Sequence, residues 1–322
     1  MKVVICLEKF SDWLEAYSIF CYFKGIDAVK VLYIENARNN EKAVKDLFGE
    51  FKSKISFEYE GTKDKGYWFR QIGASLDTLV RGDVLAAPYI RYRTGWDYVP
   101  AARKKGVVTV HLSESFPDSF GRVGYRVAFR LVGGFSVGKL LKQLAIAPFF
   151  YFYSESHKPD ICFYNMAPKV RNPFVRKTVQ AYIPKVEETK KRYLQELTGG
   201  EKRTLMISGF GYDVNRMASY LNLSKYIATS KDREIIIDGK KIPLDYYICA
   251  EEVLLSGCSD RIVGYDSTAM CWAYRIGGID ITCYEASALN EQYGFLNGRL
   301  TRRTMKRCGL TLLPECKEMI KK

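Results

Sequence analysis

The sequence has few of the residues from which metal sites are built. Only two of its 322 residues are histidines, His111 and His157, and its nine cysteines are scattered without a Cys-x-x-Cys pair. Structural zinc sites need closely spaced Cys and His ligands, so no metal site is predicted. An odd number of scattered cysteines indicates reduced thiols, which is typical of a cytoplasmic protein.

Long apolar runs are also missing. No stretch approaches the roughly 18 uninterrupted apolar residues of a membrane-spanning helix. The run Val3–Leu7 near the start is shorter than the core of a signal peptide, and no small-residue cleavage site follows it. We therefore expect Val3–Leu7 to be a first β-strand.

The charge is strongly of one sign. Lys and Arg number 50 against 36 Asp and Glu, which gives a formal net charge of +14, while 47% of the residues are hydrophobic. Such a chain can bury a large core, and its field attracts phosphates, anionic lipids or nucleic acid.

The first half alternates short β-rich runs with amphipathic stretches, a pattern that predicts a parallel sheet with right-handed crossovers. We expect its strands at Val3–Leu7, Val29–Ile34, Ile55–Tyr59, Val84–Ile90 and Val107–His111. We expect its helices at Trp13–Phe23, Ala43–Phe51, Trp68–Leu79 and Val99–Lys105.

The second half repeats this alternation after a hydrophilic segment. Residues 1–171 are predicted to form one Rossmann-like domain, 172–203 a linker, 204–290 a second Rossmann-like domain, and 291–322 a C-terminal helical segment. The expected fold class is therefore α/β, and two such halves facing each other across a cleft are typical of the GT-B architecture of glycosyltransferases.

The most informative run lies in the second half. A strand is expected to end at Gly264, and a helix is expected to begin at Ser267 and Thr268. Unpaired N–H groups at a helix N-terminus attract negative charge, and two hydroxyls there suit a phosphate. The alternative is that these residues only cap a helix.

This run resembles the C-terminal domain of bacterial sialyltransferases of the lipooligosaccharide and polysialic-acid groups. The match rests on Cys249-Ala250-Glu251 and on Gly264-Tyr265-Asp266-Ser267-Thr268, within residues 204–290. The resemblance implies that Ser267 and Thr268 bind the phosphate of a CMP-sugar, and that Glu251 or Glu252 binds the ribose hydroxyls. The alternative for both glutamates is a solvated first helical turn, which the helix dipole favours.

The sequence departs from that family at one catalytic position. The family carries a His-Pro pair upstream of this helix, whose histidine assists the departing CMP, whereas this chain has Lys231 and Arg233 there. Either cation can neutralise a leaving phosphate, but neither serves as a general acid near neutral pH. Ser208-Gly209, after the first strand of this half, is a weaker candidate for backbone contact with the nucleotide.

A transferase that inverts the sugar needs a base for the acceptor hydroxyl. The resemblance places an acidic residue after the strand that ends at His111, and Glu114 stands there, with Asp118 as the substitute and His111 as a further candidate. Arg91 and Arg93 follow another strand and are candidates for binding an anionic acceptor. The alternative for Glu114 is a capping or ion-paired loop acid.

The expected function is that of an inverting, metal-independent transferase without a cofactor. It would pass sialic acid, or a related 2-keto sugar acid, from a CMP-sugar to a glycan or glycolipid of the bacterial surface. Basic and aromatic residues in 122–153 suit contact with the inner face of the membrane. Two alternatives keep the GT-B fold, namely another nucleotide-sugar donor and a degenerate paralogue without activity. A nucleic-acid-binding protein is the alternative from another class, although no RNA- or DNA-binding motif supports it.

Overall fold

The structure is a computed structural model, and its elements form two compact units, each described here by itself. Unit 1 comprises residues 1–115, 153–164 and 172–187, and unit 2 comprises residues 116–152, 165–171 and 188–322. The residues described within them are 1–8, 12–35, 44–45, 48–88, 98–112, 137–138, 141, 158–164, 175–209, 212–230, 234–245, 247–265, 267–286, 302, 305–306 and 309–320.

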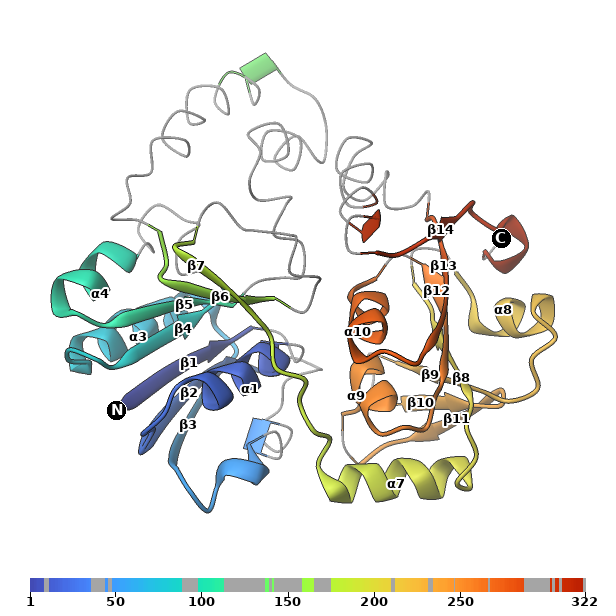
Figure 1. The fold of residues 1–322 in the computed structure, drawn as a ribbon, viewed down its shortest axis with the longest axis horizontal. Helices are drawn as coiled ribbons and strands as arrows, with labels where there is room; N and C mark the ends of the chain where they lie inside the picture. Colours follow the sequence, from blue (N-terminus) through green and yellow to red (C-terminus); the bar gives the residue numbers. More distant parts are fainter. Residues whose placement is uncertain are drawn as a thin grey trace. The chain divides into compact units, whose positions relative to one another are not determined.

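Unit 1 is built on a seven-stranded, all-parallel sheet of order β3-β2-β1-β4-β5-β6-β7 (Figure 1). Its strands are β1 (Lys2–Leu7), β2 (Ala28–Ile34), β3 (Ser56–Thr62), β4 (Val84–Ala87), β5 (Val108–His111), β6 (Ile161–Tyr164) and β7 (Lys177–Gln180). The central strands are buried apolar runs, as expected for a parallel sheet covered on both faces.

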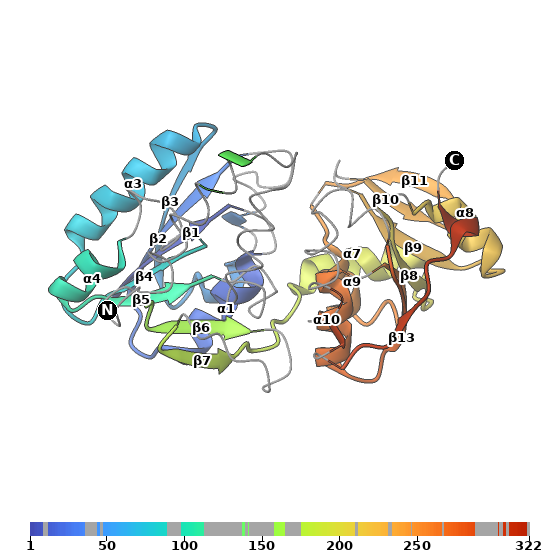
Figure 2. The ribbon, with the colours of Figure 1, turned by 90° about the horizontal axis from the view of Figure 1, so that it is seen from above.

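Helices cover both faces of this sheet (Figure 2). They are α1 (Asp12–Tyr22) on one face and, on the other, α3 (Lys65–Thr78) and α4 (Val99–Lys105), while η1 (Gly49–Phe51) is a short 3₁₀ turn. Asp64 caps α3 by accepting hydrogen bonds from the N–H groups of Gly66 and Tyr67. Gly106 ends α4 in the left-handed conformation, at φ 72°. Trp68, Ile72 and Leu76 of α3 pack on the sheet.

Unit 2 has a seven-stranded sheet of order β11-β10-β9-β8-β12-β13-β14. Its strands are β8 (Thr204–Ile207), β9 (Tyr226–Thr229), β10 (Glu234–Ile237), β11 (Lys240–Pro243), β12 (Arg261–Tyr265), β13 (Asp280–Tyr284) and β14 (Leu312–Leu313). The five strands from β9 to β14 in this order are parallel, and β10 and β11 add an antiparallel hairpin at one edge.

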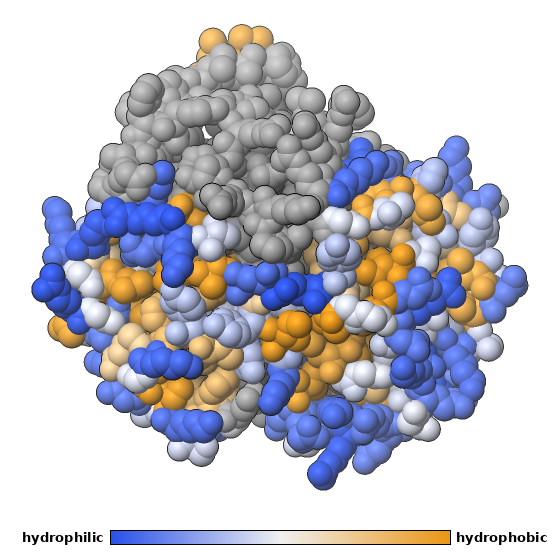
Figure 3. All heavy atoms as spheres, in the orientation of Figure 1, coloured by the Kyte–Doolittle hydropathy of each residue, from blue (hydrophilic) through white to orange (hydrophobic). Residues whose placement is uncertain are grey.

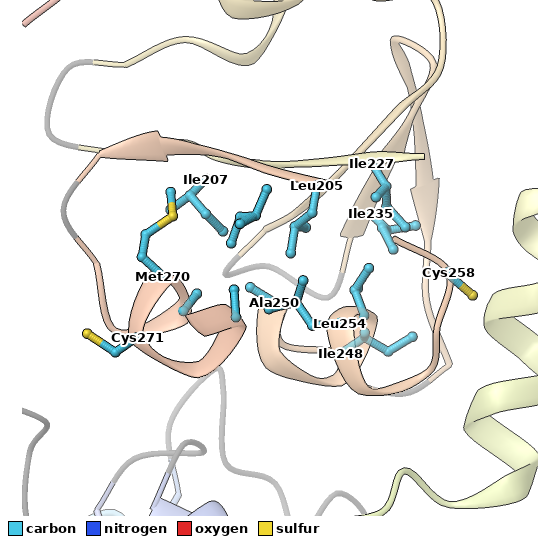
Figure 4. Close-up of a cluster of buried hydrophobic side chains, with 14 of the residues drawn as sticks. Leu205, Ile207, Ile227, Ile235, Ile248, Ala250, Leu254, Cys258, Met270 and Cys271 are labelled. Atoms are coloured by element: carbon cyan, nitrogen blue, oxygen red, sulfur yellow. The ribbon is translucent and has the colours of Figure 1, made fainter. Parts of the chain in front are cut away.

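Two buried clusters cover the two faces of this sheet. Helices α7 (Glu188–Thr198), α9 (Ala250–Leu255) and α10 (Thr268–Ile276) pack on one face. Figure 4 shows Ala250 and Met270, from the first turns of α9 and α10, facing Leu205 and Ile207 of β8. Helix α8 (Val214–Tyr220) and the turn η4 (Lys317–Met319) pack on the other face, where Met319 is fully buried.

The expected α/β architecture with two mostly parallel sheets is confirmed, and two segments contain strands that the sequence did not predict. The segment 172–203 contains β7, which pairs with β6 of unit 1, and α7, which belongs to unit 2. The segment 291–322, expected to be helical, returns as β14 beside β13 and ends in η4. Backbone pairing with distant strands decides both cases, and a local pattern does not report it.

Candidate functional site

The strand order of unit 2 reverses between β8 and β12. The chain places β9 on one side of β8 and then β12, β13 and β14 on the other side. Loops that leave the carboxyl ends of parallel strands diverge at such a reversal, and ligands of open α/β sheets bind there. Ser208-Gly209 directly follow β8, and Ser267-Thr268 follow the end of β12 after one intervening residue, so the topology brings these predicted site residues to one edge.

Ser267 and Thr268 lie at the start of a helix, as predicted. Ser267 is the N-cap residue of α10, with extended backbone (φ −129°, ψ 165°), and Thr268 is the first helical residue. The Oγ of Ser267 is buried and has no hydrogen-bond partner, and its side chain does not cap the helix. Burying a hydroxyl without a hydrogen-bond partner costs about 1–3 kcal/mol of folding free energy. The Ser267 hydroxyl and the first N–H groups of α10 therefore both favour an acceptor bound at this edge.

Gly264 has a packing role. A Cβ atom there would lie 2.7 Å from both the Cβ and the carbonyl oxygen of Ile207. Only glycine therefore permits this close approach of β12 to β8, which brings the two loops together. Ser208 is exposed directly after β8, and Gly209 follows with φ 130°, a conformation that favours glycine.

Glu252, predicted as a ribose ligand, is buried and bonded on both oxygens. Its Oε1 lies 3.0 Å from the Nζ of Lys190 on α7, and its Oε2 accepts the N–H of Cys249 at 3.0 Å. Both charged side chains are at most 3% exposed. Since a buried charge must be paired, Glu252 connects α9 to α7 and is fully occupied in doing so.

Glu251 is also buried, which excludes the alternative of a solvated first turn. Burial raises the pKa of the Cys249 thiol well above its usual value, and the nearby charges of Glu252 and Glu251 raise it further. This thiol is therefore protonated and can donate a hydrogen bond to Glu251. Glu251 lies in the first turn of α9, the helix that precedes β12 in the chain.

In unit 1 the strand order reverses between β1 and β4, and the edge there is acidic. Glu8 follows β1, its N–H donates to the Oδ2 of Asp12 at 2.8 Å, and its carboxylate pairs with Lys65. Asp12 and Glu15, in the first turn of α1, are 7% and 8% exposed. None of these three carboxylates was predicted as a site residue, although the position of Glu8 directly after a predicted strand was a usable signal.

His111 ends β5 and is buried, with 3% of its surface exposed. The other residues predicted in the first half of the chain lie outside the described part, as do the two basic residues proposed to face the leaving phosphate. These are Glu114, Asp118, Arg91, Arg93, Lys231, Arg233 and, in addition, His157.

Most of the segment 122–153 is likewise outside the described residues. Of the part that is described, Val137 and Leu141 are 63% and 60% exposed. Figure 3 shows hydrophilic residues interspersed with apolar ones over the described surface. No helix among the described residues is long and apolar enough to span a bilayer.

The described residues contain no candidate metal site and no disulfide. Within the described ranges, no three His, Cys, Asp or Glu side chains gather in a way that would hold a metal ion. The described cysteines form no disulfide.

Two comparisons of the sequence with known proteins give no match. No protein-family model matches the chain, and no curated protein sequence matches it. A function is therefore proposed on two grounds. One is the geometry at the carboxyl ends of β8 and β12, where the strand order reverses, and the other is the motif resemblance.

Proposed function

We propose that the chain is a GT-B glycosyltransferase that moves sialic acid, or a related 2-keto sugar acid, from a CMP-sugar to a bacterial surface glycan. One observation carries the proposal. The edge where the strand order reverses in unit 2 combines the N-terminus of α10, the buried Ser267 hydroxyl without a partner, and the Gly209 loop. Such an edge suits the phosphate of a nucleotide.

In this proposal unit 2 holds the donor. Ser267 and Thr268 bind the CMP phosphate, and the first N–H groups of α10 stabilise its charge as the sugar departs. Because Glu252 is occupied by Lys190 and the Cys249 N–H, the ribose hydroxyls fall to Glu251. Lys231 and Arg233 neutralise the leaving phosphate in place of the histidine of the related family.

Unit 1 supplies the base. Glu114 accepts the proton of the acceptor hydroxyl, which then attacks the anomeric carbon while the C–O bond to CMP breaks. The products are the extended glycan and CMP, and the proton remains on Glu114 until solvent removes it. Arg91 and Arg93 bind the anionic groups of the acceptor or of the sugar.

A surface glycan is assembled on a lipid, so the proposal includes contact with an anionic membrane. Val137 and Leu141 are four residues apart in the sequence and exposed, and basic residues adjoin them. Changing both to Asp should reduce co-sedimentation with phosphatidylglycerol vesicles. Val80, which is 65% exposed in unit 1, provides the control Val80→Asp. Equal binding by both variants would exclude this membrane contact.

Incubation with CMP-Neu5Ac and a panel of terminal galactosides tests the activity. Mass spectrometry should detect the mass of one added sialic acid on at least one acceptor, together with free CMP. A protein that binds CMP but transfers from no CMP-sugar would correspond to the degenerate paralogue, and one that binds UDP instead to a transferase with another donor.

A further inference from the structure

Tyr212 contacts three loops at the carboxyl edge of the unit 2 sheet. It is 1% exposed, and its hydroxyl donates to the carbonyl oxygen of Glu285 at 2.8 Å, just after β13. Its ring stacks on that of Tyr265, at the end of β12, with 6.2 Å between centroids and 20° between planes. Its backbone pairs with Gly209, after β8, through an N–H···O bond of 3.0 Å.

Gly209, in the loop after β8, packs closely against the ring of Tyr265. A Cβ at position 209 would lie 3.0 Å from the hydroxyl oxygen of Tyr265. Tyr265 is two residues before Ser267, the N-cap of α10. A shift of the Tyr212 ring therefore moves the Gly209 loop and the start of α10 relative to each other.

The C-terminal segment holds Tyr212 from the other side. Tyr212 forms an isolated antiparallel bridge with Ile320, and the N–H of Asp213 donates to the carbonyl oxygen of Met319 at 2.9 Å. The guanidinium of Arg216 donates to the carbonyl oxygen of Ile320 at 2.9 Å. The loop after β8 is thus fixed by residues about a hundred positions later in the chain.

We propose that Tyr212 is a positioning residue for the nucleotide site. It holds the Gly209 loop, Tyr265 and Glu285 in one arrangement, so that the backbone at Gly209 and the N-terminus of α10 can contact the same nucleotide. The C-terminal residues 316–320 complete this support. The proposal rests on the function proposed above, because it takes a nucleotide as the ligand.

The test compares Tyr212→Phe with Tyr226→Phe. Tyr226 belongs to the same core cluster, is 6% exposed, and its hydroxyl donates to the Oδ1 of Asn215 at 3.3 Å. It begins β9 and therefore lies at the amino edge of the parallel strands, away from the site. Each variant loses one hydroxyl and one hydrogen bond, so similar decreases in thermal stability are expected.

Only Tyr212→Phe should change the site. We expect its Kd for CMP to rise about fivefold, the effect of one hydrogen bond, while Tyr226→Phe binds like the wild type. In the transfer assay the donor KM should rise with kcat unchanged, since Tyr212 touches no reacting atom. Hydrogen exchange without ligand should quicken around Gly209 and Tyr265 in Tyr212→Phe alone.

Equal CMP affinities and equal exchange in the two variants would overturn the proposal while leaving the proposed function intact. If the wild type binds no CMP, the proposed function fails. Hydrogen exchange then decides separately whether Tyr212 couples the loops, and unchanged exchange would reject that coupling as well.

Discussion

The sheets of both units have a point where the strand order reverses, but the side chains at that point differ between the units. In each sheet the strand order reverses beside the unit's first strand, between β1 and β4 in unit 1 and between β8 and β12 in unit 2. The edge in unit 1 carries the carboxylates of Glu8, Asp12 and Glu15. The edge in unit 2 carries the N-terminus of α10 and the Ser267 hydroxyl.

This difference fits the two roles that the proposed transferase needs. Carboxylates repel a phosphate and suit hydroxyls or protons, whereas N–H groups and hydroxyls attract a phosphate. In the proposed transferase, the side chains after these strands would decide which half of the reaction each unit takes. The predictions below test that division.

The largest effect is expected from the base in unit 1. Glu114→Gln should lower turnover by about a hundred- to ten-thousandfold, the usual contribution of a general base, while CMP affinity stays unchanged. Initial rates with CMP-Neu5Ac and calorimetry with CMP measure the two quantities. Full turnover in Glu114→Gln, with loss in Glu8→Gln, would instead place the base after β1.

The next effect concerns stability within unit 2. Lys190→Ala should destabilise the protein by about 3–5 kcal/mol, because it leaves the Glu252 charge buried without its partner. Urea unfolding measures this change. Lys191→Ala is the control, since Lys191 forms only a 3.9 Å surface pair with Glu188. Equal stability of the two variants would mean that Glu252 remains available for a ribose.

A smaller effect is expected for the phosphate site itself. Changing both Ser267 and Thr268 to Ala should raise the Kd for CMP about ten- to hundredfold, because hydrogen bonds to a charged group are lost. The fold should be retained, since the Ser267 side chain makes no cap bond with α10. Unchanged CMP affinity, by calorimetry, would remove the phosphate site from this edge.

The smallest effect is expected at Asp238, which contributes to the stability of unit 2 away from the proposed site. Burial tends to raise the pKa of Asp238, but hydrogen bonds from Arg203 and from the Tyr226 N–H outweigh it and lower that pKa. A lowered pKa stabilises the fold above the unfolded value of about 4, and this contribution is lost as the pH falls through the folded value.

Asp238→Asn should therefore lower the melting temperature at pH 7 and lose this deficit in acid. Thermal unfolding across the acidic range measures the difference, and CMP binding at pH 7 should be unaffected. A deficit that does not depend on pH would contradict the role of the ionised carboxylate.

The sequence predicts the central strands well because they are continuous apolar runs, such as Val3–Leu7 in β1. It misses β6, β7, β11, β13 and β14, of which β7 and β11 are four-residue strands of polar or mixed composition. Such strands are held by backbone pairing with neighbours, so their own side chains carry little signal.

The candidate site shows the same limit. The start of α10 could be read locally, since a strand ending in glycine precedes two hydroxyl residues. The occupation of Glu252 could not, because its partner Lys190 lies 62 residues earlier in the chain. The acidic edge of unit 1 depends on which strand neighbours β1, and that neighbour, β4, follows about eighty residues later.

The shift of the melting temperature on adding CMP, UDP or a single-stranded oligonucleotide decides whether the protein has a CMP site. A ligand that binds only the folded state raises that temperature by an amount that grows with the logarithm of its concentration relative to its Kd. We expect CMP to raise the melting temperature of the wild type, and the Ser267→Ala/Thr268→Ala variant to lose most of that rise. UDP and the oligonucleotide should leave the melting temperature unchanged. A rise with the oligonucleotide alone, or none with CMP, would contradict the proposed CMP site.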